Sequence, residues 1–288
     1  MDNAATQETK PQPKVTALVV SYNNVEALRQ CIAALEKSKD RENIEIIVVD
    51  KGSHDGSATI DSEFPHITVL RLPRNFGNAK ALNIGMRTAA AEYMFFLVPE
   101  VEVQPDTVVQ LANRLDNEAD AVAVCPVLTG DDHQFYRLPG PQHGAEFEFV
   151  QVNTDAEVVP VEGASFDATM ARKYYIRGIN FLDEKYGHYW VDVDLCYQIR
   201  RSGKKVLGLP RLTCRYTPRP DRFPDSALRL LEADRVTGGS RYFSKYYGFL
   251  SGVMYRIKQA LRAVGTFRLG LFSAIISGRK VDGTQTEL

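Results

Sequence analysis

The chain has 288 residues and a formal net charge of −1, with 44% hydrophobic and 25% charged residues. This length allows one large α/β domain with an appendage, and the composition is that of a globular protein with a sizeable core. The near-neutral charge argues against a general nucleic-acid binder. Four cysteines lie far apart without CxxC spacing, which indicates buried, reduced thiols and excludes a disulfide framework: Cys31, Cys125, Cys196 and Cys214.

The first part of the chain is predicted to lie outside the folded core. Residues 1–14 are polar, contain Pro11 and Pro13, and lack the apolar region of a signal peptide, so we expect a flexible tail. Nowhere does the sequence contain an uncharged apolar run of the roughly 18 residues that a transmembrane helix needs. No transmembrane helix is therefore expected.

Strand patterns alternate with helix patterns up to residue 128. Apolar strand patterns occupy 15–22, 44–50, 66–72, 93–98 and 121–128. Helical patterns fall at 25–38 (with Asn24 as the expected cap), after Gly56, at 75–90 and at 105–117. This βαβαβαβαβ order predicts a mostly parallel sheet with helices on both faces.

The pattern is less regular from 129 to 160, where a strand is expected near 147–152. This segment suits acceptor-binding loops or a plain surface insertion. Regular structure is expected again from 161, with a helix from about Val193 to Gly203 and a strand at 205–210. Past Pro224 the chain is predicted to be helical to about 277.

The stretch 44–57, IEIIVVDKGSHDGS, is the centre of the predicted architecture. Its apolar half predicts a buried strand that ends at Asp50, and its second half carries Gly52 and Gly56. Ligands of open α/β sheets bind outside the carboxyl ends of the strands, where a carboxylate accepts hydrogen bonds from a base or ribose. The alternative interpretation is a turn that caps the next helix.

Five segments in this order resemble the glycosyltransferase family 2 of the GT-A fold, in particular its rhamnosyltransferase-like members. They are SYNN (21–24), VVDKGSHDGS (48–57), RNFGNAKALNIG (74–85), FFLVPEVEV (95–103) and FLDEKYGHYWVDVDLCYQIRRSG (181–203). The resemblance covers roughly residues 15–216. A dinucleotide-binding oxidoreductase fits less well, because no GxGxxG loop follows the first strand.

The resemblance implies an α/β GT-A nucleotide-diphospho-sugar transferase domain at 15–222, and the composition of 223–288 predicts a basic, amphipathic helical extension after it. It implies an inverting transfer of a sugar from a nucleotide-activated donor to a hydroxyl of a glycan or lipid-linked acceptor, in cell-surface polysaccharide or glycolipid assembly. By the same resemblance, the donor is bound by Ser21, Tyr22, Asp50, Lys51, Asn75, Gly77 and Asn83. The alternative for the last three, and for Gly85, is a turn and a tightly packed helix entry.

Asp192 matches the aspartate of the family's Glu-Asp motif, which is the general base. An N-cap role for Asp192 is compatible with this one. Trp190, the only tryptophan, suits either a stacking wall for a sugar or a core position.

Four positions depart from the family pattern. Val98-Pro99-Glu100 replaces Asp-x-Asp, which leaves Glu100 as the expected ligand for a divalent cation, Mg²⁺ or Mn²⁺. Lys51 replaces an asparagine and either meets a phosphate or is solvated, Val191 replaces the motif's glutamate, and 212–217 lack the usual histidine, with Arg215 and Tyr216 as the polar candidates. These departures leave open a catalytically impaired relative that binds nucleotide sugar or glycan, or acts as a scaffold.

The region from Arg235 to Lys280 is basic and apolar, with nine basic residues and no acid. This combination predicts helices that lie on an anionic membrane surface and places the protein in the cytoplasm or on the inner face of the membrane. The alternatives are helices that pack on the catalytic domain or form a homodimer interface.

Overall fold

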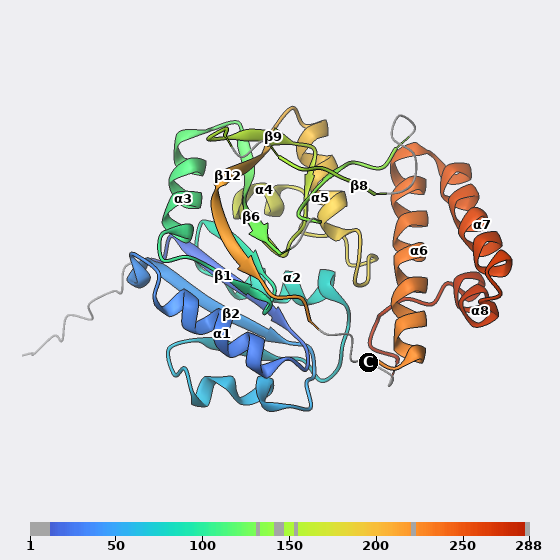
Figure 1. The fold of residues 1–288 in the computed structure, drawn as a ribbon, viewed down its shortest axis with the longest axis horizontal. Helices are drawn as coiled ribbons and strands as arrows, with labels where there is room; N and C mark the ends of the chain where they lie inside the picture. The colour runs from blue at the N-terminus through green and yellow to red at the C-terminus, as the bar shows by residue number, and fades with distance from the viewer. Residues whose placement is uncertain (1–11, 131–132, 141–146, 153–154, 220–222, 286–288) are drawn as a thin grey trace, which may run out of the picture.

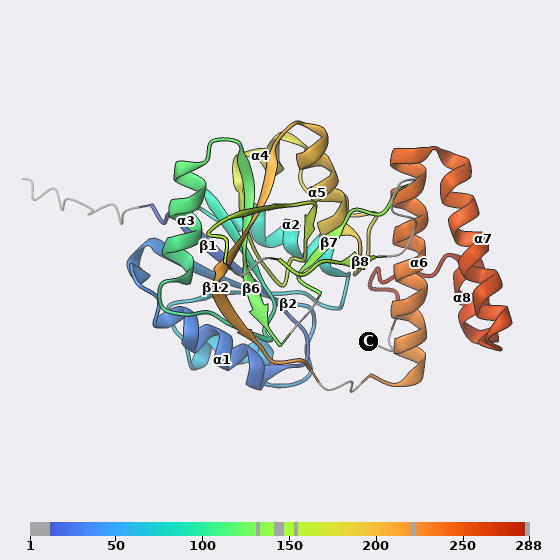
Figure 2. The same ribbon diagram turned by 45° about the horizontal axis from the view of Figure 1, so that its top comes forward.

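A computed structural model of the protein describes residues 12–130, 133–140, 147–152, 155–219 and 223–285. A central sheet with helices on both faces occupies one side of the molecule, and three C-terminal helices stand on the other (Figure 1). The first of these helices lies between the sheet domain and the other two, as a second view also shows (Figure 2).

β1 (Val15–Ser21) is the centre of the first half of the sheet and is buried along its whole length. It pairs in parallel with β2 (Ile44–Asp50) and β4 (Tyr93–Leu97), and β3 (Thr68–Arg71) extends the sheet beyond β2. Burial on both faces explains why these strands read as continuous apolar runs. The register sets Ser21 opposite Asp50, so the carboxyl ends of β1 and β2 meet at one edge.

The second half of the sheet is mixed. β11 (Ala168–Arg172) runs antiparallel between β4 and β6 (Ala121–Thr129), and β12 (Lys205–Tyr216) runs parallel to β6. Two short strands, β5 (Val101–Glu102) and β9 (Val159–Val161), pair antiparallel with β12. A small second sheet contains β10 (Gly163–Ala164), β7 (Phe135–Arg137) and β8 (Glu148–Phe149).

The helices cover the sheet on both faces because strand side chains point to alternate faces. α1 (Val25–Glu36) and α3 (Thr107–Asn117) share a core with Ala17 and Val48. α2 (Asn78–Thr88), α4 (Lys173–Gly178) and α5 (Val191–Arg201) pack into the other core with Leu18 and Val49. Two 3₁₀ helices, Arg41–Asn43 and Gly56–Ser62, flank β2. The four cysteines are buried and unpaired.

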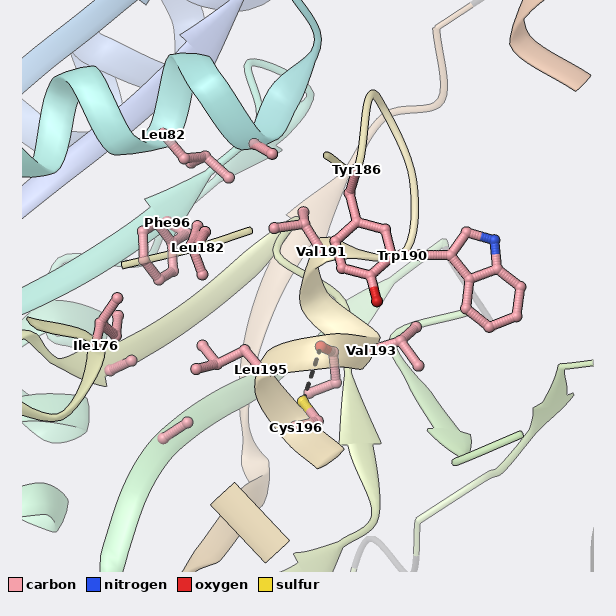
Figure 3. Close-up of a cluster of buried hydrophobic side chains, with 14 of the residues drawn as sticks. Leu82, Phe96, Ile176, Leu182, Tyr186, Trp190, Val191, Val193, Leu195 and Cys196 are labelled. Carbon is pink, nitrogen blue, oxygen red and sulfur yellow. Dashed lines mark hydrogen bonds between the residues drawn. The ribbon is translucent and has the colours of Figure 1, made fainter. Parts of the chain in front are cut away.

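The start of α5 differs from the predicted one. Helix α5 begins at Val191 with Trp190 as its N-cap residue, so the prediction of Asp192 as N-cap is wrong, and Asp192 lies in the first turn. Trp190 has φ 74° and is 2% exposed. Figure 3 shows the surrounding cluster, in which Leu82 of α2, Phe96 of β4 and Leu195 of α5 contribute side chains.

The C-terminal extension consists of α6 (Asp225–Tyr247), α7 (Phe249–Gly265) and α8 (Leu269–Ser277). α6 joins the domain core through Tyr242 and Phe243 and α7 joins it through Tyr255, and a small separate core forms between α6, α7 and α8. The expected helical region to about 277 is thus present. Within the described ranges, no helix combines the length and apolar character needed to cross a membrane.

Candidate active site

A cavity of about 330 Å³ opens at the carboxyl ends of β1, β2 and β4. Its lining combines cationic, acidic and aromatic side chains from eight separate stretches of the chain, among them Tyr22, Lys51, Glu100, His188 and Arg219. This is the edge at which open α/β sheets bind ligands.

Two buried polar atoms next to this cavity lack partners among the described residues. Asp50 is 1% exposed; its Oδ2 accepts hydrogen bonds from the backbone N–H groups of Gly52 (3.2 Å) and Ser53 (3.1 Å), while its Oδ1 accepts none. The Oγ of Ser21, opposite Asp50 in the register, is also buried without a partner. Unsatisfied buried acceptors are costly and call for a ligand or water.

Lys51 carries its amine into the cavity. Its side chain is 4% exposed, and its Nζ donates to Asn78 Oδ1 at 2.8 Å. Burial lowers the pKa of Lys51 to about 7, although the Glu100 carboxylate partly offsets this by favouring the charged amine. Lys51 is therefore an ordered cavity residue, and the expectation of a simply solvated amine is not met.

Glu100 projects into the cavity at the end of β4. Its Oε1 accepts a hydrogen bond from Asn24 Nδ2 at 2.6 Å. Asn24 occupies the N-cap position of α1 but makes no side-chain cap bond; instead Asp55 Oδ2 accepts from the Val25 N–H at 3.0 Å. Asn24 thus orients Glu100 and leaves the second carboxylate oxygen for another contact.

His188 enters the cavity from the loop before α5. Its backbone N–H donates to Asp234 Oδ2 at 2.7 Å, and its carbonyl accepts from Asn78 Nδ2 at 3.1 Å. Its Nδ1 is buried without a partner among the described residues, and burial, together with the Lys51 charge, holds the pKa well below 6.5. A neutral imidazole therefore faces the ligand space, and sequence reasoning passed over it although it lies inside the 181–203 segment.

Arg219 is the second cation of the cavity. It donates to the carbonyls of Tyr22 (2.8 Å) and Asn23 (2.9 Å), and its guanidinium lies 4.9 Å from the Phe223 ring centroid. Neither Arg215 nor Tyr216 supplies this cation: Arg215 pairs with Glu102 (3.6 Å), and Tyr216 is a wall residue. No local pattern marks Arg219, because its partners lie just after β1, nearly 200 residues earlier in the chain.

The remaining residues that were predicted to bind the sugar donor divide into two groups. Asn75 lines the cavity, and its Oδ1 accepts from the Gly77 N–H at 3.0 Å. Gly77 adopts φ 86° against the backbone of Gly187 and forms a tight helix entry. Asn83 is 1% exposed and binds both backbone groups of Leu182, and a Cβ on Gly85 would lie 2.3 Å from Leu18 Cδ1. For Asn83 and Gly85 the structure supports the packing alternative.

Asp192 is not one of the residues that line the donor cavity. Its Oδ2 accepts from the Tyr136 hydroxyl at 3.1 Å. Burial raises the pKa of Asp192 and outweighs the backbone and Tyr136 hydrogen bonds that lower it. A carboxylate with a raised pKa is a stronger proton acceptor near neutral pH.

A second cavity of about 580 Å³ lies between β8 and the C-terminal helices, lined in part by Phe147, Arg235 and Tyr255. Two of its lining residues, Phe147 and Arg235, connect this cavity to the surroundings of Asp192. The Phe147 ring contacts Tyr136 at 5.5 Å between centroids, and Arg235 acts electrostatically on Asp192.

Trp190 is enclosed by aromatic rings. Its Nε1 donates to the Arg235 carbonyl at 2.8 Å, and its ring lies 4.9 Å from Phe147 and 5.3 Å from Tyr242. With 2% of its surface exposed, Trp190 is a core residue, and we do not propose it as a sugar contact.

The carboxylate oxygen that Glu100 offers fits a divalent cation that arrives with a phosphate ligand. In the described part of the chain, no group of three or more His, Cys, Asp or Glu side chains is arranged to hold a metal. Mg²⁺ is commonly bound through one or two carboxylates plus substrate phosphates, and one oxygen of Glu100 meets that need. Glu100 therefore suits a cation shared with a diphosphate.

Comparison with known proteins places this geometry in a family. The Glycosyl transferase family 2 model matches residues 16–185. Putative glycosyltransferase EpsH of Bacillus subtilis (strain 168) is 31% identical over 114 residues, which are 38% of this chain and 33% of that protein. dTDP-rhamnosyl transferase RfbF of Shigella flexneri is 23% identical over 199 residues, 68% of this chain and 66% of that protein. The chain thus matches only about a third of the length of EpsH.

Solved structures share the fold at low identity. GalNAc-T7, determined with UDP, GalNAc and Mn²⁺, has a TM-score of 0.65 at 14% identity and covers 80% of this chain and 48% of that one. The mannosyltransferase PcManGT of Pyrobaculum calidifontis, in complex with GDP-Man and Mn²⁺, has a TM-score of 0.59 at 15% identity and covers 93% and 86%. The chain has the GT-A fold and belongs to glycosyl transferase family 2.

Proposed function

We propose that the protein transfers a sugar from a nucleotide-activated donor to a hydroxyl acceptor with inversion, in the assembly of cell-surface polysaccharide or glycolipid. One observation carries this proposal: a single cavity at the strand ends contains two cations and two carboxylates, Glu100 and Asp167, and the unpaired buried acceptors of Ser21 and Asp50 belong to residues next to its lining. A nucleotide diphosphate needs these complementary groups. The family match and the nucleotide ligands of the structural neighbours support the same assignment.

The nucleoside half of the donor is assigned to Asp50 and its neighbours. The free Oδ1 of Asp50 suits a base N–H donor, such as the imide of uracil or thymine. Ser21 Oγ can bond a second polar atom, and the Tyr22 ring forms part of the wall. A bound base would thus relieve the cost of two orphan atoms.

The diphosphate half is assigned to Lys51, Arg219 and Glu100. Lys51 and Arg219 bring positive charge to one cavity, and Asn75 adds an amide. Glu100 would hold Mg²⁺ or Mn²⁺, which, when bound, offsets the charge of the diphosphate leaving group. The two cations provide part of the same compensation from the protein itself.

Asp192 is assigned as the general base. Its carboxylate accepts the proton of the acceptor hydroxyl, whose oxygen bonds to the anomeric carbon while the bond to the diphosphate oxygen breaks. This single displacement inverts the anomeric configuration. The Tyr136 hydroxyl orients Asp192 and remains protonated, because burial raises its pKa well above 10. The acceptor would reach Asp192 from the second cavity, past Phe147 and Arg235.

A second candidate is a relative that binds nucleotide sugar or glycan without transferring it. Two observations favour it: Val191 precedes Asp192 without a carboxylate, and one Glu100 oxygen is already bonded to Asn24. Binding without turnover distinguishes this candidate from the enzyme.

The test is a thermal-shift and turnover screen with UDP-, dTDP- and GDP-sugars, with Mn²⁺ or with excess EDTA. We expect one nucleotide class to raise Tm and to be hydrolysed slowly in Mn²⁺ but not in EDTA. Asp50→Asn should remove the rise in Tm. The asparagine amide would place its own N–H opposite the N–H of the base, and two donors cannot form a hydrogen bond. Asp55→Asn is the matched control from the same loop, where both oxygens of Asp55 are already bonded, one to the Ser57 N–H of the 3₁₀ helix and one to the Val25 N–H of α1.

A stabilising donor without hydrolysis or transfer would favour the binding protein. Full turnover in EDTA would show that Lys51 and Arg219 suffice and that Glu100 holds no metal. The absence of any shift with all three nucleotide classes would contradict the proposal.

A further inference from the structure

Helices α7 and α8 expose apolar side chains over a continuous run of the chain. Nine large hydrophobic residues from 249 to 276 are between 41% and 91% exposed: Phe249, Leu250, Met254, Ile257, Leu261, Val264, Phe267, Leu269 and Ile276. Elsewhere in the described ranges, only Phe149 and Tyr174 belong to this exposed class. Large contiguous apolar exposure marks an interaction surface.

On α7 the exposed residues form a single stripe. Leu250, Met254, Ile257, Leu261 and Val264 follow one another at intervals of three or four residues, which places them on one face of a helix. The buried residues of α7 (Gly252, Tyr255, Ala260 and Ala263) lie on the face toward α6. In both ribbon views α7 and α8 lie on the far side of α6 from the sheet domain (Figures 1 and 2).

The charges that accompany the stripe are all positive, since residues 235–280 contain no acid. The structure divides these cations by role. Arg241 pairs with Asp183 (2.6 Å), Lys245 pairs with Asp194 (2.8 Å), and Arg256 donates to the Ile275 carbonyl. Arg268 pairs with Glu232 of α6, and Lys258 and Arg279 are exposed. By helical geometry, Lys258 lies at the edge of the α7 stripe.

The turn between α7 and α8 presents a phenylalanine outward at a conformational cost. Phe267 has φ 57° and is 91% exposed. Its N–H donates to the Val264 carbonyl and the Arg268 N–H to the Ala263 carbonyl, which is the helix-ending arrangement that usually has glycine at this position. A bulky residue in the left-handed region is strained, so the exposed ring calls for a role outside folding.

We propose that α7, the Phe267 turn and α8 form a docking face for the surface of an anionic lipid bilayer. Interfacial helices place an apolar face among the lipids and lysine or arginine at the headgroups. A second copy of the chain fits less well, because a symmetric contact would bring the like-charged edges together without an acid to pair them. This inference does not depend on the glycosyl-transfer assignment.

The test is co-sedimentation of the full chain with vesicles of phosphatidylglycerol and phosphatidylcholine, and with phosphatidylcholine vesicles alone. We expect binding to the anionic vesicles at low salt and a loss of binding as salt rises. Phe267→Gly should weaken binding about tenfold or more, because it removes an inserted ring. Its Tm should be unchanged or higher, because glycine suits φ 57°. Weaker binding would then not reflect unfolding.

Two matched controls separate the surface from general effects. Tyr174→Ala removes an exposed aromatic ring from α4 and should bind vesicles like wild type. Lys258→Glu should weaken binding by about fivefold or more, since each basic residue near the surface contributes to that extent. Lys37→Glu makes the same charge change at the end of α1 and should leave vesicle binding unchanged.

Three results would overturn the proposal. The first is wild-type protein that ignores anionic vesicles at low salt. The second is equal binding by the Phe267 and Tyr174 variants. The third is a dimer in light scattering that Phe267→Gly converts to monomer while neither form binds vesicles, which would make a second copy the occupant.

Discussion

Lys51 has an environment unlike that of an ordinary surface lysine. Its amine is buried, has one hydrogen-bond acceptor in Asn78, and shares the cavity with Arg219. The pKa of about 7 follows chiefly from burial. An anion bound beside Lys51 favours the charged amine, so the bound form must have a higher pKa than the free form.

Donor binding should therefore be linked to uptake of a proton above pH 7. We expect affinity for a sugar nucleotide, whose diphosphate does not titrate in this range, to fall by up to tenfold per pH unit above about 7. Below pH 7 the amine is already charged and affinity should level off. Calorimetry at pH 8 in buffers of different ionisation enthalpy measures the proton directly.

Lys51→Met is the control for this linkage. It should bind the donor more weakly at pH 6 and show no proton uptake at pH 8. Constant wild-type affinity from pH 6 to 9 would show that Lys51 does not contact the phosphates.

Among the structural elements, the entry of α2 positions one wall of the site. Gly77 has φ 86° and ψ 172°, a conformation open almost only to glycine. A Cβ there would lie 2.7 Å from the Gly187 carbonyl carbon, and the Asn78 N–H donates to the Gly187 carbonyl at 2.9 Å. Gly77 thus allows α2 to hold the loop that carries His188.

Gly77→Ala should lower the free energy of unfolding by about 3 kcal/mol or more, because backbone strain and a steric clash add. Gly203→Ala is the matched control: it also has positive φ (74°), but nothing lies within 4 Å of its Cβ position. It should cost only about 1–2 kcal/mol. Urea unfolding measures both, and equal losses would show that the Gly187 contact is unimportant.

The sequence predicted the first half of the fold well and the second half less well. Buried strands such as β1 and β2 carry continuous apolar runs, which are local signals. The antiparallel insertion of β11 and the length of β12 depend on pairing between distant segments, which periodicity does not encode. The predicted strand at 205–210 is only the first half of β12, which continues to Tyr216.

The same contrast holds at the site. Tyr22, Lys51 and Glu100 follow strand ends, so order along the chain was enough to place them in the cavity. Arg219 binds a carbonyl 197 residues earlier, and only the folded chain brings the two together.

On the scale of the whole molecule, Asp234 links the C-terminal helices to the site. It is 1% exposed on α6; its Oδ2 accepts from the His188 N–H, and its Oδ1 accepts from the Val281 N–H at 2.9 Å. Burial raises the pKa of Asp234 to about 6. The folded state therefore binds a proton that the unfolded state has already lost between pH 4 and 6.

Because this folded-state pKa is raised, the contribution of Asp234 to stability should fall as pH rises from 4 to 7, by up to about 3 kcal/mol. Urea unfolding across this range should show the trend as a difference between wild type and Asp234→Asn. Asp183→Asn should give the opposite trend at lower pH: the hydrogen bond from Arg241 helps to hold the pKa of Asp183 below its usual value despite burial, so its contribution to stability should be lost only as pH falls below about 4. A wild-type to Asp234→Asn difference independent of pH would mean that Asp234 is ionised without penalty.

The most direct test of the account is the effect of Asp192→Asn on transfer and on donor binding, measured on the same preparation. The substitution keeps the side chain's shape and an oxygen that can accept from Tyr136 but removes the proton acceptor. We predict that transfer falls by about 10² to 10⁴-fold while donor affinity stays within about twofold of wild type. Retention of most of the transfer activity would contradict the assignment of Asp192 as the base.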